Sequence, residues 1–389
     1  MPLPRPGMRA AAVAIATVAA LFLARVSAAE TPDRHRPANG RETLLVLPES
    51  LEVAQANSAG DAAGAARQAE ELLRIARASG DARYFGRAGA VIRPWLDREP
   101  IPVAIDLVAA ELAQQRHDFG AARQHLDRAL SAQPREVSAL LMRANIGLLT
   151  GEFSSARRDC LVILQAGAAY AGTVCLASSM TGPGSLERSR RLLAALDAHG
   201  SEPVALARWR LATEADLALR AGDARAALEI LERAHALDRT HEETRTRLAE
   251  ALLAQGKPER ALALASEPNP SLARLVVGLR AALAQDGSQA TTWRRQVDAA
   301  LEESRRRGAS PHEREEGLLA LHADQDAARA LAHASRNFAL QKDTADLRLL
   351  VDAALAAGDV QALAEARAWL GASGFEDRVA AARLARAAT

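Results

Sequence analysis

Apolar residues recur at intervals of three and four along most of the chain, the spacing of one buried face of an α-helix. Short turns, most of them a glycine followed by an acidic residue, interrupt this pattern at intervals of about 12 to 20 residues. Because glycine ends helices and aspartate caps their N-termini, the pattern predicts a series of short helical hairpins. The turns are Gly60-Asp61, Gly80-Asp81, Gly151-Glu152, Gly222-Asp223, Gly256-Lys257 and Gly358-Asp359.

Composition agrees with an all-α protein. The 389 residues are rich in alanine and arginine, both of which favour helices, and aromatic residues make up only 3%. Strands draw on β-branched and aromatic residues, so a β-sandwich or barrel is excluded and a doubly wound sheet is disfavoured.

Successive hairpins are related by a period of about 34 residues. The same spacing separates Phe119 from Phe153, Ala122 from Ala156, and Ala227 from Ala261. The period, with a small alanine early in the second helix, resembles the tetratricopeptide repeat. This resemblance implies a right-handed α-solenoid of stacked antiparallel helix pairs with a concave inner surface, a fold that generally binds proteins or peptides.

Five segments are expected from these features. The clear repeats end before Pro268-Asn269-Pro270, and weaker hairpins flank them. The segments are a signal peptide at 1–28, a flexible lead-in at 29–50, degenerate hairpins at 51–102, the repeat array at 103–266, and degenerate repeat-like helices at 271–389.

The segment 1–28 has the composition of a secretory signal. Arg5 and Arg9 precede an apolar run over 10–24, and small residues surround Ala28. We expect cleavage after Ala28 or Ala29 and a periplasmic or secreted protein. The run is short for a membrane span of about 20 residues, but an uncleaved anchor is the alternative.

The charge balance bears on partners. The chain carries +1, and loss of the three arginines in residues 1–28 leaves −2. Such a near-neutral body has no general attraction for nucleic acid, so no nucleic-acid partner is expected. No later segment is an uncharged apolar run of the length that a membrane span needs, so no membrane span is expected in the mature chain.

Motifs for catalysis and for metals are missing from the sequence. His241-Glu242 and His312-Glu313 each lack the second histidine of a zinc-protease motif. There is no phosphate-binding loop and no Gly-x-Ser-x-Gly elbow. We therefore expect no enzyme activity, no cofactor and no metal.

The two cysteines allow two interpretations. Cys160 and Cys175 fall on helices that pack together in this architecture, and an exported protein meets oxidising conditions. A disulfide is one interpretation, and two buried thiols are the other.

The resemblance also suggests a ligand site, because the first helix of each tetratricopeptide pair lines the inner surface. Its ninth position carries Glu111, Asn145, Asp216 and Glu250 here, and Trp209 falls at a second position. Three acids and a tryptophan suit a cationic or mixed extended segment. Alternatively, the acids pair with arginines and Trp209 belongs to the core.

These observations favour an exported scaffold that binds a protein or peptide partner in its groove without catalysis. Two other classes stay open. One is a membrane-tethered or self-assembling envelope adaptor. The other is an enzyme, or a subunit of an enzyme complex, whose site is not local in sequence.

Overall fold

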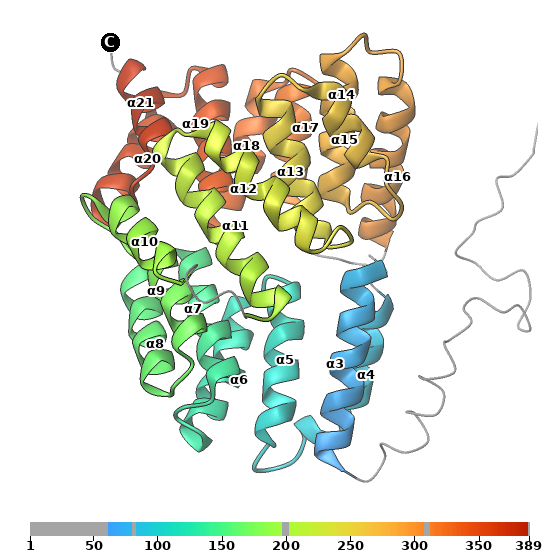
Figure 1. Ribbon diagram of the computed structural model, residues 1–389. Coiled ribbons are helices and arrows are strands. Elements are labelled where there is room, and N and C mark those ends of the chain that lie inside the picture. Colours follow the sequence, from blue (N-terminus) through green and yellow to red (C-terminus); the bar gives the residue numbers. More distant parts are fainter. Residues whose placement is uncertain (1–60, 80–82, 197–201, 307–311, 388–389) are drawn as a thin grey trace, which may run out of the picture. The chain divides into compact units, whose positions relative to one another are not determined.

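The computed structural model describes residues 61–79, 83–196, 202–306 and 312–387. The predicted signal peptide and lead-in lie outside these residues. Every regular element within them is a helix, and consecutive helices pack as antiparallel pairs in an α-solenoid, as predicted (Figure 1). None of the described helices is long and apolar enough to cross a membrane.

Each pair consists of a first or A helix and a second or B helix. The A helices are α3 (Ala62–Ser79), α5 (Val103–Gln115), α7 (Val137–Thr150), α9 (Ala169–Ser178), α11 (Val204–Ala221), α13 (Glu242–Ala254), α15 (Leu272–Ala284), α17 (Glu313–His322) and α19 (Thr344–Ala357). The B helices are α4 (Arg83–Leu96), α6 (Phe119–Ala132), α8 (Phe153–Gln165), α10 (Ser185–Ala194), α12 (Ala224–Leu237), α14 (Pro258–Ala265), α16 (Ala290–Arg306), α18 (Ala327–Leu340) and α20 (Val360–Ser373). A last helix, α21 (Arg378–Arg386), follows the final pair.

Two of the predicted glycine-acid turns join helices in the expected way, whereas Gly60 and Gly80-Asp81 lie outside the described residues and Glu152 makes no side-chain cap. Gly222 ends α11 with a φ of 87°, a left-handed conformation that glycine adopts at low cost. Asp223 then caps α12 by accepting a hydrogen bond from the Ala226 N–H. The same arrangement recurs at Gly358 and Asp359, between α19 and α20.

The repeat period corresponds to equivalent positions in successive pairs. Phe119 and Phe153 are the first residues of α6 and α8. The four alanines that the period relates are all buried, where small side chains let paired helices approach closely: Ala122, Ala156, Ala227 and Ala261.

Helix pairing continues beyond the proline segment. α14 contacts α15, and α15 pairs with α16 although the sequence there departs from the repeat pattern. Gly278 of α15 makes room for the ring of Trp293 on α16, because a Cβ at Gly278 would lie 2.4 Å from that ring. A tryptophan opposite a glycine thus replaces the usual contact of small residues.

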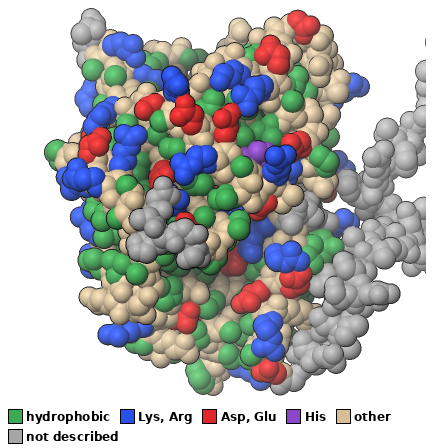
Figure 2. Space-filling model, in the orientation of Figure 1, with side chains coloured by type: hydrophobic (Ala, Val, Ile, Leu, Met, Phe, Trp, Pro, Cys, Tyr) green, Lys and Arg blue, Asp and Glu red, His purple; other side chains and the backbone are tan. Residues whose placement is uncertain are grey.

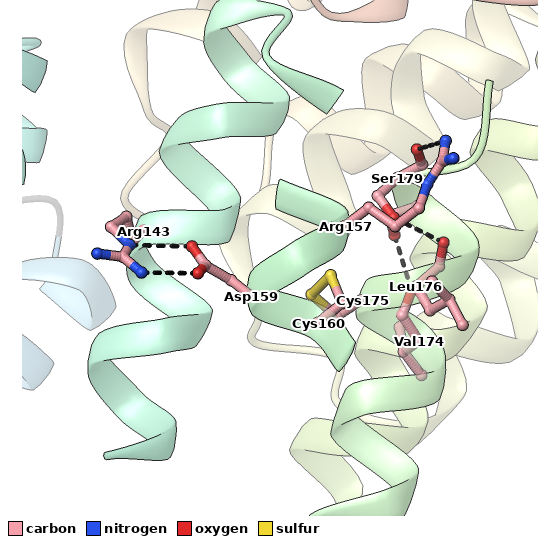
Figure 3. The surroundings of a disulfide bond; sticks show 9 residues. Arg143, Arg157, Asp159, Cys160, Val174, Cys175, Leu176 and Ser179 are labelled. Carbon is pink, nitrogen blue, oxygen red and sulfur yellow. Dashed lines mark hydrogen bonds and ion pairs between the residues drawn. A yellow bond between two sulfur atoms is a disulfide. The ribbon is translucent and has the colours of Figure 1, made fainter. Parts of the chain in front are cut away.

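A disulfide joins two neighbouring repeats. Cys160 of α8 and Cys175 of α9 are bonded, with their Cα atoms 5.4 Å apart, and both are buried (Figure 3). On the opposite side of α8, the Arg143 guanidinium of α7 donates two hydrogen bonds, of 3.0 and 2.7 Å, to the Asp159 carboxylate. The helices α7, α8 and α9 are therefore linked both covalently and by an ion pair.

The C-terminal helices return to the middle of the array. α21 contacts both α11 and α19, and Figure 1 shows it beside α11. Two backbone hydrogen bonds of 2.7 Å reinforce this return, one from the Lys342 N–H to the Leu149 carbonyl and one from the Gly182 N–H to the Gly374 carbonyl. The chain thereby closes a ring of helices in which each contacts the next, formed by α11, α12, α13, α15, α17, α19 and α21.

Candidate binding surface

Charged residues recur at one position of the A helices. Glu250, Arg280 and Asp352 are the ninth residues of α13, α15 and α19 respectively. Arg280 lies near enough to both Glu250 and Asp352 for their charges to raise its pKa, although burial lowers it overall. We name Glu250, Arg280 and Asp352 the ninth-position set.

Glu250 and Arg280 have no direct partners within the described residues. Burial raises the pKa of Glu250, an effect opposed by the nearby Arg280 and Arg314. Burial lowers the pKa of Arg280, opposed by Glu250 and Asp352. No hydrogen bond or ion pair satisfies either side chain in the part of the chain that the structure describes. Asp352, by contrast, accepts hydrogen bonds of 2.6 and 2.7 Å from Arg383 of α21.

His322, at the end of α17, belongs to the same surface. Its pKa is lowered to about 4, mainly because the surrounding protein desolvates it and also because Arg280 is near. Its side chain is nevertheless exposed to water. The imidazole is therefore neutral at pH 7 and offers one donor and one acceptor beside the Arg280 guanidinium.

A neighbouring ionic cluster is fully paired and holds three helices together. Arg314 of α17 donates to Asp343 at 2.6 Å and to Asp346 at 2.7 Å, and Asn337 of α18 also donates to Asp346. Asp343 and Asp346 form the capping box of α19. These groups position the A helices rather than offer ligand contacts.

In two charged clefts elsewhere in the molecule, a central arginine is paired within the chain. One, of about 300 Å³, lies between α6, α7 and α8, where Arg143 binds Asp127 and Asp159. The other, of about 390 Å³, lies between α16, α17 and α18, where Arg294 binds Asp298 and Asp324. Figure 2 shows that acidic and basic side chains are also interspersed over the part of one face that the grey residues leave visible.

Two of the predicted groove acids are paired within the chain. Glu111 of α5 forms an ion pair with Arg77 of α3. Asp216 of α11 lies 3.6 Å from Arg220, one helical turn away. Among the three predicted acids, only Glu250 lacks such a partner in the described residues.

The other two predicted residues differ in exposure. Asn145 is exposed on α7. Trp209 is half-buried and packs against two hydrophobic clusters, one of α5 to α9 and one of α9 to α11, which places its ring in core packing. No hydrogen bond or ion pair in the described residues joins any two of the five predicted residues.

Arg280 and Asp352 were not predicted from the sequence, although the sequence holds a signal for them. Counting nine residues from the starts of α15 and α19 reaches both of them, by the same rule that selected Glu250. Both residues lie beyond the predicted repeat array of residues 103–266. In addition, within the described residues no group of three or more His, Cys, Asp or Glu side chains is placed to hold a metal ion.

A family model described as tetratricopeptide repeat matches residues 218–285, from the end of α11 to just past the end of α15. Residues 218–285 therefore form a tetratricopeptide-repeat segment. The match extends across Pro268–Pro270 into the segment that departs from the sequence pattern.

Solved structures give weaker similarities. The human IFIT1 dimer with m7Gppp-AAAA is 14% identical, with a TM-score of 0.45, over 87% of this chain and 85% of that chain. The P58(IPK) TPR domain is 15% identical, with a TM-score of 0.25, over 82% of this chain and 97% of that chain. Because these scores are low, the ligand named with IFIT1 carries no weight for this chain, and the expectation of no nucleic-acid partner stays a prediction. Among curated proteins, none matches the sequence.

Proposed function

We propose that this protein is an exported, periplasmic scaffold that binds an extended segment of a partner protein on the ninth-position set, without catalysing a reaction. The tetratricopeptide fold supports the general role, since its stacked pairs form protein-interaction surfaces. The observation that carries the site is the unpaired Glu250 and Arg280, close to each other on neighbouring A helices of the described chain.

The chemistry of this surface suits a segment of mixed charge. Glu250 can accept from a ligand lysine or arginine, and Arg280 can bind a ligand carboxylate in a bidentate manner. Each of these partially desolvated groups would gain a partner that the described chain does not supply. Charge-assisted hydrogen bonds of this kind fix both the position and the direction of an extended ligand.

Export is supported by the disulfide. Disulfides persist in oxidising compartments and are rare in the cytosol. The Cys160–Cys175 bond fits the signal-like composition of residues 1–28. N-terminal sequencing of the protein from a periplasmic fraction should begin at Ala29 or Glu30. An intact N-terminus in the membrane pellet would instead favour the tethered adaptor.

The binding site is tested by charge reversal with a matched control. Wild type, Glu250→Arg, Arg280→Glu and the control Glu365→Arg, an exposed residue of α20, are used for crosslinking and affinity mass spectrometry from an envelope extract. The partner should be captured by wild type and by the control, and should be at least tenfold depleted with either reversal. Circular dichroism and thermal melts check that the variants fold. Equal capture by all four proteins would remove binding from this surface.

A further inference from the structure

Between α20 and α21, the residues Gly374 to Asp377 form a non-helical segment that packs on α8, α10 and α11. This segment, named here the C-terminal latch, is held much as a bound peptide would be. The Gly374 carbonyl accepts a 2.7 Å hydrogen bond from the Gly182 N–H, just before α10. Gly374 has a φ of 66°, and a Cβ there would lie 3.0 Å from the Gly182 nitrogen, so this close approach needs glycine.

The aromatic side chain of the latch is buried among aromatic and cationic neighbours. Phe375 is only 7% exposed and stacks on Phe153, with ring centroids 5.4 Å apart. The guanidinium carbon of Arg220 lies 3.9 Å from the centroid of the Phe375 ring, within the range of a cation–π contact. Trp369 lies beside the same ring, at 5.5 Å between centroids.

The acidic side chain of the latch caps α10. The N-cap of that helix is Gly184, which has no side-chain capping bond of its own. Glu376 Oε2 accepts hydrogen bonds from the Ser185 hydroxyl at 3.0 Å and from the Leu186 N–H at 3.2 Å. The pKa of Glu376 is lowered although burial acts in the opposite sense, because these hydrogen bonds favour the carboxylate. The N-terminus of α10 therefore binds the carboxylate of a residue that is distant in the sequence, and its free N–H groups and helix dipole favour such an anion.

The latch leaves one group of this surface unsatisfied. Arg220 is 3% exposed, and its Nε donates to the Glu376 carbonyl at 2.9 Å. Its Nη2 is buried and has no hydrogen-bond partner in the described part of the chain. A buried guanidinium nitrogen without a partner is costly, so an occupant that also satisfied Nη2 would bind more strongly than the latch does.

We propose that this surface of α8, α10 and α11 is a second docking site, which takes an aromatic residue followed by an acidic residue from a partner protein. The chain's own Gly-Phe-Glu-Asp segment occupies the site in cis. A partner must therefore bind this surface more strongly than the latch does in order to displace it. Because the latch belongs to the same chain, it competes at a high effective concentration, so only a tighter or multivalent partner displaces it. This site contains none of the residues of the ninth-position set, so charge reversal at Glu250 or Arg280 should leave binding of a peptide here unchanged.

The test uses a fluorescent peptide with the sequence of residues 372–379 and the full-length chain. In the double variant Phe375→Ala, Glu376→Ala the cis segment loses its anchors, and the variant should bind the peptide at least tenfold more tightly than wild type. A peptide with alanine in place of its phenylalanine should not bind. Adding Arg220→Ala should abolish binding, whereas the control Val360→Ala, Glu365→Gln on exposed positions of α20 should behave as wild type.

A second measurement uses only the wild-type chain, so its result does not depend on whether the double variant folds. The same peptide with a photoreactive group at its phenylalanine is irradiated in excess with the wild-type chain, and the crosslinks are mapped by mass spectrometry. Crosslinks within residues 153–220, lost with the alanine peptide, would support the site. Absence of binding to a folded double variant, or crosslinks only elsewhere, would overturn the proposal. A double variant that dimerises would overturn it in favour of a second copy as occupant.

Discussion

Two regions of the chain build the same helix stack by different means. In α7 to α9 the paired helices meet at small residues, and the disulfide joins adjacent repeats. A Cβ at Gly147 of α7 would lie 3.3 Å from the Cβ of Ala156 on α8. In α15 to α19 a tryptophan fills the space opposite Gly278, and the Arg314 cluster joins the helices. The difference shows that the repeat geometry tolerates large changes of side-chain volume when a glycine compensates for them.

The largest expected difference between the regions is their response to reduction. The disulfide closes a loop of about 16 residues, worth ~3 kcal/mol in the chain-entropy account. A reducing agent should therefore lower the stability of wild type by about this amount, and should leave a Cys160→Ala, Cys175→Ala variant unchanged. Hydrogen exchange should rise in α8 and α9 but not in α17 to α19. If the reducing agent changes neither the stability of wild type nor its hydrogen exchange, the disulfide does not make α7 to α9 more stable than α15 to α19.

A smaller and more direct comparison adds one methyl group to each glycine. Gly278→Ala places a Cβ 2.4 Å from the Trp293 ring, which must move, at a cost of about 1–3 kcal/mol. Gly147→Ala meets Ala156 at 3.3 Å, and a helical alanine also regains up to about 1 kcal/mol of propensity. Chemical denaturation should therefore show Gly278→Ala to be clearly the less stable variant. The reverse order would mean that Trp293 is loosely packed.

The smallest effect concerns pH. The pKa of His322 is lowered from 6.5 to about 4 in the folded protein, so the unfolded chain takes up a proton at this residue at a pH where the folded chain does not. Stability should fall as the pH drops from about 6.5 to 4, and His322→Asn should lessen this fall. Because the side chain is exposed, solvent screening keeps the effect small. Thermal melts across this range measure it, and an identical pH profile for both proteins would contradict it.

The sequence predicted the helix pairs because their causes are local and periodic. Phe119, Phe153 and the buried alanines one repeat apart recur at the same places in the stack. The contacts that bring the C-terminal helices back to the middle of the chain could not be predicted in this way. Those of Gly374 and Glu376 join distant parts of the sequence and occur only once.

The candidate site was predicted in part. Glu250 followed from the repeat pattern, but the partners of Glu111 and Asp216 depend on which arginine each helix brings near.

The return of the C-terminal helices also bears on how the protein unfolds. A linear repeat array loses its terminal units first, since each unit contacts only its neighbours. Here the last helices contact the middle of the chain, so releasing α20 and α21 exposes the Phe153 ring and uncaps α10. Without a partner at the latch site, the end of the chain should therefore not fray independently, and α20 and α21 should unfold together with the helices that they contact.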